Sequence, residues 1–229
     1  MAMASNWKEM LESNAWSQGV GAPNATVPAA FAEWAVPIDQ LPSEGRRLYE
    51  YDLAGAKRLL AEAGHPNGFK AQMETTAGYG PDYMDAVQVT LKNWKDAGIE
   101  AELKLKEYGA FVTTTLLGKF DKLATGLRGG WTDPDSYLFR PHMPGQVLNT
   151  AGVNDPKLTE MIKLQRHTFD VARRKEIVYD IQRYLSQQVY YLYGPSVSAV
   201  GAWESYVKNF GPNIGHDMGG RLMVAWLDK

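Results

Sequence analysis

The sequence predicts an α/β fold in which strands alternate with helices along one chain. Residues 69–76 and residues 99–106 alternate apolar with polar side chains, which is the pattern of strands with one buried face. Between them, apolar residues recur at steps of three and four from Pro81 to Ala97, the spacing of one helix face. A strand, a helix and a second strand form a βαβ unit, so we expect parallel strands with the helix packed against the sheet.

Composition places the chain among soluble globular proteins. It has 229 residues, of which 45% are hydrophobic and 22% charged, enough for one sizeable core or two small ones. The formal net charge is −2 and the charges are interspersed, so we expect no nucleic-acid partner. The sequence has no cysteine, which excludes disulfides and thiolate metal ligands. No segment approaches the ~20 apolar residues of a membrane span, and we expect no export signal.

The first 50 residues predict a helix and an extended connection. One helical face near the N-terminus would hold Trp7, Met10, Leu11 and Asn14. Residues 19–42 contain four prolines and no sustained period, so we expect an extended segment that lies along the surface. The side chains that we expect to anchor this connection are Phe31, Trp34 and Val36.

Aspartates mark the beginnings of three further helices. Asp52 precedes a run with one apolar face, which Gly64 would end. Asp155 opens a second helix, and Asp170 opens a third that would run to about residue 188. Within the 81–97 helix, Trp94 lies on the apolar stripe and is expected in the core.

Shorter elements complete the predicted order. We expect a short helix at 111–117, a third strand at 120–127 and a last strand at 189–193. Gly98 would end the 81–97 helix directly before the second strand.

The most informative segment follows the third predicted strand. Residues 128–138 read Arg-Gly-Gly-Trp-Thr-Asp-Pro-Asp-Ser-Tyr-Leu and place a guanidinium, an indole and two carboxylates on one loop. Open α/β sheets bind ligands at the carboxyl ends of their strands, so this loop is a candidate ligand site. Trp131 favours that interpretation, because an indole is seldom placed in a loop that only connects.

An ordinary turn is the alternative interpretation of the same loop. Asp133 and Asp135 would then satisfy backbone N–H groups, and Arg128 would pair with one of them. For the two carboxylates we favour this turn role.

Motifs of catalysis are absent from the sequence. There is no His-Glu-x-x-His, no Gly-x-Ser-x-Gly and no phosphate-binding loop. The four histidines are isolated and form no zinc spacing, so we expect no metal and no cofactor. A hydrolase would have to use Asp133 and Asp135 as its acid–base pair. Residues two apart on a turn rarely lie on opposite sides of a scissile bond, so we expect no enzyme.

Four segments, in this order along the chain, resemble the hallmarks of one family. They are Tyr51–Gly64, Gly98–Leu103, Gly130–Asp135 and Asp170–Lys175. The family is that of the family 5 substrate-binding proteins of ABC transporters, the dipeptide, oligopeptide and nickel type. This resemblance implies one lobe of a type II periplasmic-binding-protein fold, with a mixed sheet and flanking helices.

The resemblance also implies a division of the chain. Residues 1–229 would form a single C-terminal lobe of a two-lobed protein, in which residues 1–50 are an N-terminal helix and extended connection. Residues 195–229 would return toward a first lobe that this chain lacks.

On this resemblance, the chain is the solute-capture lobe of an ABC importer, for peptides or a similar small organic solute. Its partners would be the solute and, through the full-length protein, the membrane permease. We expect a monomer whose full-length parent works in the periplasm or at the cell surface. Carbohydrate-binding and nickel-binding members of the family are the alternatives.

In a two-lobed binder each lobe supplies half of the ligand site. We assign Trp131 to stacking, Asp133 to a cationic or hydroxyl group, and Arg128 to an anionic or carbonyl group. Asp135 is the second carboxylate of the loop, and Tyr108, just after the second strand, is a further cleft residue.

One difference from the family concerns the length of the loop. In similar peptide binders, an aspartate of this loop receives the α-ammonium of the peptide. Here only Thr132 separates the Gly-Trp pair from Asp-Pro-Asp, where family members carry several residues. Asp133 is the nearest counterpart of that aspartate.

Overall fold

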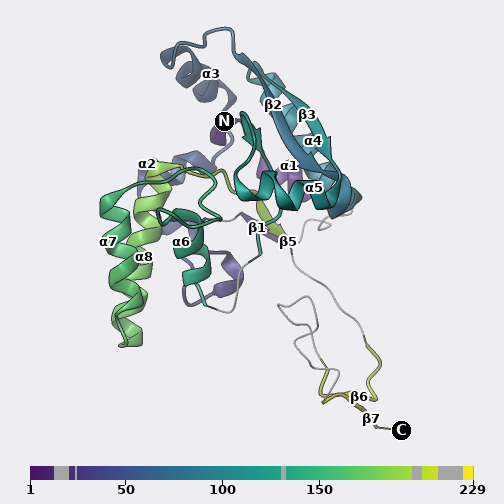
Figure 1. The fold of residues 1–229 in the computed structure, drawn as a ribbon, viewed down its shortest axis with the longest axis vertical. Helices are drawn as coiled ribbons and strands as arrows, with labels where there is room; N and C mark the ends of the chain where they lie inside the picture. The colour runs from purple at the N-terminus through teal and green to yellow at the C-terminus, as the bar shows by residue number, and fades with distance from the viewer. Residues whose placement is uncertain (13–20, 24, 130–132, 198–202, 211–223, 229) are drawn as a thin grey trace.

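The computed structural model describes residues 1–12, 21–23, 25–129, 133–197, 203–210 and 224–228 (Figure 1). It contains a part built around a sheet and a part built from helices, and each has its own buried core. The helices are α1 (Trp7–Glu12), α2 (Ser43–Arg46), α3 (Leu53–Glu62), α4 (Pro81–Asp96), α5 (Tyr108–Thr113), α6 (Asp135–His142), α7 (Pro156–Arg166) and α8 (Val171–Gln188). The strands are β1 (Gly21–Pro23), β2 (Phe69–Thr76), β3 (Ile99–Lys106), β4 (Leu123–Ala124), β5 (Pro195–Val197), β6 (Val207–Lys208) and β7 (Trp226–Leu227).

The central sheet has three parallel strands in the order β3, β2, β4. β2 and β3 pair along all eight residues of each strand. The predicted βαβ unit is therefore confirmed, with both strands at their predicted bounds. β4 is much shorter than the predicted 120–127 and pairs with β2 only at Met73 and Glu74. One further bond continues the pairing, because the N–H of Thr125 donates to the carbonyl of Glu74 at 3.0 Å.

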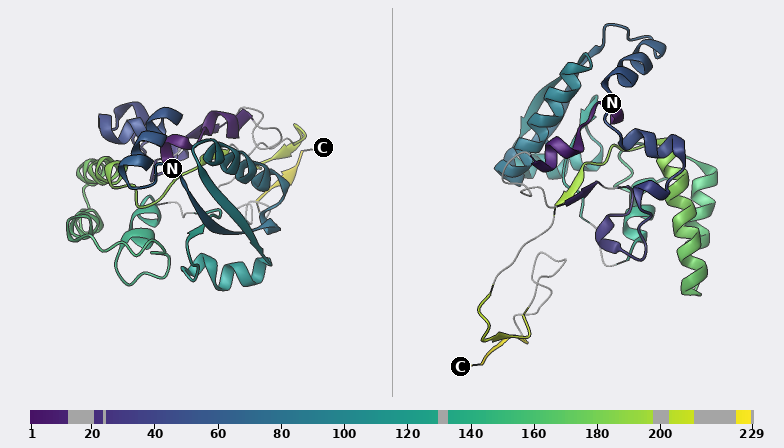
Figure 2. Two further views of the ribbon diagram at one scale, coloured as in Figure 1. Left: turned by 90° about the horizontal axis from the view of Figure 1, so that it is seen from above. Right: turned by 180° about the vertical axis from the view of Figure 1, so that it is seen from behind.

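Helix α4 packs on one face of the sheet (Figure 2). Trp94 lies in this core with 6% of its surface exposed, as predicted, and its indole N–H donates to Ser5 Oγ at 2.8 Å. Met3 and Ala4 of the 3-10 helix η1 (Ala2–Ala4) are buried in the same region. The beginning of the chain is therefore part of the sheet's core.

The opposite face of the sheet is only partly the wet face that the alternation predicts. Lys70 and Glu100 are exposed and pair across the strands at 2.6 Å. Near the carboxyl ends, however, Glu74 is only 5% exposed. Its carboxylate accepts a bond from Thr115 of the 3-10 helix η7 (Thr115–Leu117) at 2.6 Å and pairs with Lys106 at 2.6 Å. The turn after α5 covers this part of the face. The alternation of apolar and polar residues within one strand cannot predict such cover, because it comes from another segment.

All three predicted aspartate caps are present. Side-chain oxygens of Asp52, Asp155 and Asp170 accept bonds from the backbone N–H three residues later, at 2.8, 3.1 and 2.7 Å. The predicted helix stops are also confirmed, since Gly64 and Gly98 have φ of +87° and +91°. Residues with a Cβ rarely adopt such angles.

Helices α6, α7 and α8 form the second part, and the connection before α2 runs along it (Figure 1). The N–H of Val36 donates to Oε1 of Gln182 at 3.1 Å, and Nε2 of Gln182 donates to the carbonyl of Trp34 at 2.7 Å. Val36 is buried, while Phe31 and Trp34 are partly buried against the helical core. The predicted anchors of the connection are therefore confirmed.

The predicted strand at 189–193 is wrong. Helix α8 ends just before it, and Val189 has a φ of 52°, in the left-handed region. Tyr191 then donates through its hydroxyl to the carbonyl of Pro141 at 2.8 Å, so its side chain ties this segment to α6. The strand lies further along, at β5, which pairs antiparallel with β1. The predicted helix at 111–117 is divided between α5 and η7.

Residues 203–210 and 224–228, which we call the arm, contain β6 and β7. The two strands pair antiparallel, with Val207 opposite Leu227. The arm lies apart from both other parts of the chain in Figures 1 and 2. Several of its apolar side chains are exposed, with 42% of the surface of Trp203 and 60% of that of Leu227 accessible.

Candidate functional site

The carboxyl ends of the three parallel strands meet at one edge of the sheet, where the sequence predicts a ligand site. A network of hydroxyls lies at this edge. Oγ1 of Thr75 is 2.9 Å from the hydroxyl of Tyr83 and donates to the carbonyl of Thr125 at 3.0 Å. The Tyr83 hydroxyl is also 3.4 Å from Oγ1 of Thr125. These contacts join β2, α4 and the segment after β4, so the edge has a defined shape.

Four aromatic side chains gather at the same edge, and we call Tyr79, Tyr83, Tyr108 and Phe111 the aromatic cluster. The ring centroid of Tyr79 lies 5.1 Å from that of Tyr83, 5.7 Å from that of Tyr108 and 5.9 Å from that of Phe111, all with edge-to-face geometry. Such pairs attract one another and fix ring orientation. Tyr108 is 49% exposed, so it offers a ring to solvent from a fixed base.

Residues 125–128 lead from the aromatic cluster to the helical part. A Cβ on Gly126 would lie 2.9 Å from Cζ of Phe111, so the backbone passes directly against the cluster. Two residues later, the exposed guanidinium of Arg128 lies 5.0 Å from the ring centroid of Tyr191. Its Nη2 donates to the carbonyl of Leu148 at 3.5 Å. Within the described ranges, no carboxylate pairs with Arg128, which leaves its charge available to a ligand.

Trp131 lies outside the described residues, together with Gly130 and Thr132. The structure continues at Asp133, whose carboxylate forms a two-point ion pair with Arg174 of α8. Oδ1 accepts from Nη2 at 2.6 Å, and Oδ2 accepts from Nη1 at 2.9 Å. The hydrogen bond from Arg174 is the main reason why the pKa of Asp133 is lowered.

Asp135 is more enclosed than Asp133, with 23% of its side chain exposed against 50%. Its N–H donates to Oδ1 of Asp133 at 2.8 Å, which is the turn hydrogen bond that the sequence favours. Its carboxylate accepts a bond from Nε2 of Gln165 and lies 3.5 Å from Nε of Arg166. Burial raises the pKa of Asp135, against the pull of Arg166.

The arginine partners of the loop differ from those that the sequence suggests. Arg128 is not the ionic partner of either carboxylate, since α8 and α7 supply Arg174 and Arg166 instead. Residues 125–128 thus meet the aromatic cluster at Gly126, through Phe111, and carry Arg128 at their far end. The structure places Asp133 and Asp135 against the helical hairpin, beside an open depression.

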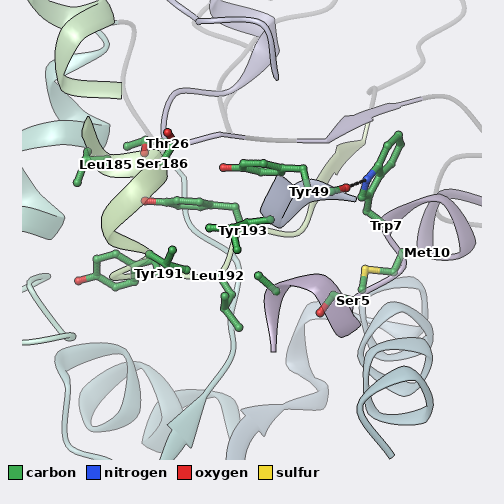
Figure 3. A pocket seen from close by; sticks show the side chains of 13 residues that line it. Ser5, Trp7, Met10, Thr26, Tyr49, Leu185, Ser186, Tyr191, Leu192 and Tyr193 are labelled. Carbon is green, nitrogen blue, oxygen red and sulfur yellow. Dashed lines mark hydrogen bonds between the residues drawn. The ribbon is translucent and has the colours of Figure 1, made fainter. Parts of the chain in front are cut away.

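A small cavity lies between α1, the 3-10 helix η5 (Arg47–Tyr49) and the segment after α8 (Figure 3). Its volume of about 60 Å³ leaves room for a few water molecules and not for a peptide. Figure 3 shows Tyr49 of η5 on one side, and Tyr191 and Tyr193 of the segment after α8 on another. Burial raises the pKa of Tyr49 to about 12. Tyr191 lines this cavity, and its ring also contacts the guanidinium of Arg128. The sequence did not predict this contact, because residues 189–193 were assigned to a strand.

The described residues contain no group of three or more histidine, aspartate or glutamate side chains that could hold a metal ion. His142 is buried, with Nδ1 3.0 Å from the carbonyl of Leu138. Burial lowers the pKa of His142 to about 4, so the ring is neutral at pH 7 and belongs to the core. Across the described ranges, no helix combines the length and apolar character that a membrane crossing requires.

Comparison with known proteins gives one family. Residues 1–145 match the family described as bacterial extracellular solute-binding proteins, family 5 Middle. The dipeptide-binding protein of Escherichia coli (strain K12) is 26% identical over 146 residues, which are 61% of this chain and 27% of that protein. Heme-binding protein A of Haemophilus influenzae is 24% identical over 132 residues, which are 56% of this chain and 22% of that protein.

A solved structure agrees with the fold over the whole chain. The periplasmic binding protein DppA of Helicobacter pylori, in complex with the peptide STSA, superposes with a TM-score of 0.73 at 21% identity. The superposition covers 100% of this chain and 43% of that one. The chain thus spans less than half of that structure and about a quarter of the curated relatives.

Proposed function

The chain belongs to family 5 of the bacterial extracellular solute-binding proteins, and from this we propose that it is the solute-capturing lobe of an ABC importer's binding protein. Residues 1–229 would be one lobe of two, and residues 195–229 would lead back to the other. The shares of its relatives that the chain spans support this division. The exposed apolar side chains of the arm support it as well, because they lack cover from the other described parts.

One observation supports the ligand site above the others: Arg128 rests on Tyr191 without a described carboxylate partner, at the edge where strand ends meet. A guanidinium that is fixed but not neutralised can bind an anionic or carbonyl group of a solute. The aromatic cluster, with Tyr108 at its surface, would contact the apolar portion. Trp131 would add stacking from the loop between them.

The solute would be held in a cleft that closes when the two lobes approach each other. Closing excludes water, which strengthens each hydrogen bond and ion pair to the ligand. The closed form would then be recognised by a membrane permease, outside the cytoplasm. We propose a peptide or a similar small organic solute, because the relatives named above include dipeptide- and peptide-binding proteins.

Two other ligand classes within the family are less well supported. The aromatic cluster would also suit a carbohydrate, whose apolar faces stack on rings. For nickel, no suitable group of ligands occurs among the described residues. The pKa of Asp133 is lowered and that of Asp135 is raised, which would suit the base and the acid of a hydrolase. Each carboxylate is already paired with an arginine, however, and this argues against that role.

Native mass spectrometry of the two-lobed protein tests the proposed function. A co-purified small molecule would reveal the chemical class of the solute directly. We expect saturable binding by the two-lobed protein, and weak or undetectable binding by this chain alone. Tight binding by the single lobe would contradict the shared-cleft mechanism. Turnover of a peptide or glycoside that disappears in Asp133→Ala would favour the hydrolase instead.

A further inference from the structure

Most hydrogen-bond acceptor sites of the Asp133 carboxylate are occupied by groups of the protein itself. Oδ1 of Asp133 accepts from Arg174 at 2.6 Å and from the N–H of Asp135 at 2.8 Å, and Oδ2 accepts from Arg174 at 2.9 Å. An ionised carboxylate offers about four acceptor sites. Because two-point pairs with arginine are among the strongest charge-assisted contacts, Asp133 keeps about one free acceptor site and no unbalanced charge.

Arg174 is in turn held by the helical part. Its Nε donates to Oε1 of Gln165 at 3.0 Å, and its guanidinium lies 5.1 Å from the ring centroid of Trp34. Gln165 is fully buried, and its Nε2 donates to Asp135. The ion pair between Asp133 and Arg174 is therefore the exposed end of a network. That network joins the loop to α7, to α8 and to the connection before α2.

We propose that Asp133 and Arg174 position the loop, and that Asp133 does not receive an α-ammonium group from the solute. This inference rests on the proposed function and specifies its solute. An incoming ammonium group would find about one free acceptor site on a carboxylate whose charge Arg174 already balances, and a full ion pair would require it to displace a guanidinium that holds Asp133 at two points. Pulling Arg174 away would also leave the buried amide oxygen of Gln165 without this donor, which is costly.

The solute class follows from this assignment. Arg128 remains the available charge of the loop among the described residues, so the solute presents an acidic or carbonyl group to this lobe. It needs no free amino group at the loop. Compounds that carry an acidic group and a blocked amine, such as N-acylated peptides, therefore fit this lobe as well as free peptides do.

Hydrogen exchange of the full chain tests the positioning role without any ligand. Asp133→Ala and Arg174→Ala should each accelerate amide exchange in residues 133–140 by about tenfold, and leave β2 and β3 unchanged. The double variant should exchange no faster than the faster of the two single variants, because each single variant already breaks the ion pair between Asp133 and Arg174. Glu160→Ala is the matched control, since it breaks an exposed pair with Lys163 on α7. Unchanged exchange near Asp133, or additive effects in the double variant, would overturn the proposal.

Calorimetry on the two-lobed protein tests the solute class, with alanyl-phenylalanine and N-acetyl-alanyl-phenylalanine as probes. We expect their dissociation constants to agree within about threefold, and Asp133→Asn to weaken both by the same factor. A preference of more than about tenfold for the free amine, lost in Asp133→Asn, would overturn the proposal. If neither probe binds, the peptide class of the proposed function fails. The exchange experiment then still decides whether Asp133 and Arg174 position the loop.

Discussion

Arg128 and Asp133 belong to one loop, yet their surroundings give them different roles. Arg128 lies over Tyr191 without a described carboxylate partner, whereas Asp133 is neutralised by Arg174, which comes 41 residues later. The sequence predicted the loop, its place after a strand and its charged side chains. It could not predict which charges pair, because pairs between distant residues depend on how the helices pack. An arginine nearby in sequence is therefore a poor guide to the partner of a loop carboxylate.

Replacing Arg128 tests its role at the level of one side chain. In the two-lobed protein, Arg128→Ala should weaken binding of a ligand that carries a carboxylate by about 10- to 100-fold, because a charged hydrogen bond is lost. The melting temperature should change little, since Arg128 is exposed and makes one long hydrogen bond. Isothermal titration calorimetry and differential scanning calorimetry measure the two effects.

Arg140→Ala is the control for Arg128→Ala. Arg140 lies in α6 beside the depression near Asp133 and has the same charge. We expect ligand affinity to stay the same in this variant. An equal loss in both variants would mean that only the net charge of the lobe matters, and Arg128 would then have no specific role.

Glu74 gives a prediction about acid stability. Hydrogen bonds from Lys106 and Thr115 hold its pKa at about 2, well below the usual value for a glutamate. Because the folded-state pKa is the lower one, Glu74 stabilises the fold above about pH 4.5, and this contribution is lost as the pH falls toward 2. Glu74→Gln should therefore lower stability at pH 7 by about 1.5–3 kcal/mol. It should also flatten the fall in melting temperature between pH 4.5 and pH 2.

The exposed pair on the same face of the sheet provides the control. Glu100 pairs with Lys70 at 2.6 Å, but more than half of each side chain is exposed. Solvent screens such pairs, so Glu100→Gln should barely change the melting temperature at any pH. If the two glutamate variants behave alike, burial does not set the contribution of Glu74.

At the scale of elements, local signals were sufficient where a helix or strand depends on its own residues. The aspartate caps, the glycine stops and the alternation in β2 and β3 all predicted the observed bounds. Local signals failed where contacts with residues far away in the sequence determine the secondary structure. The segment 189–193 was predicted as a strand, but side-chain bonds to α6 and to the N-cap of α7 hold it. The predicted third strand finds only two partners on β2.

The caps of α7 and α8 allow a comparison between two similar helices. Asp170 caps α8 through one bond to the N–H of Arg173, so Asp170→Ala should cost about 1 kcal/mol. Asp155 caps α7 and also accepts bonds from the hydroxyls of Tyr184 and Tyr190, at 2.7 and 3.0 Å. Asp155→Ala should therefore cost about 2–4 kcal/mol. Urea unfolding of both variants measures the difference, and equal losses would show that the tyrosine bonds add nothing.

At the scale of the whole molecule, the described residues form two larger cores, a small third cluster of Ala25, Val36 and Leu41, and an arm that joins none of them. The sheet part and the helical part each bury their own apolar side chains, whereas composition predicted one sizeable core or two small ones. The sequence could not show how they are arranged, because that depends on contacts such as those of Gln182 with the connection before α2. The arm has two strands of two residues each and exposed tryptophans. So short a hairpin is only marginally stable by itself.

Shortening the chain tests whether the arm packs with the rest of this chain or with the proposed first lobe. We expect a chain that ends at residue 202, which keeps the pairing of β5 with β1, to have a melting temperature within about 2 °C of the full chain. It should no longer associate with the proposed first lobe when that lobe is supplied separately, because the exposed side chains of Trp226 and Leu227 would form that contact. Trp226→Ser with Leu227→Ser in the full-length chain should weaken the same association without loss of stability. Scanning calorimetry measures the melting temperature, and analytical ultracentrifugation measures the association.

A fall in melting temperature of more than about 4 °C on shortening would instead show that the arm packs against the rest of this chain.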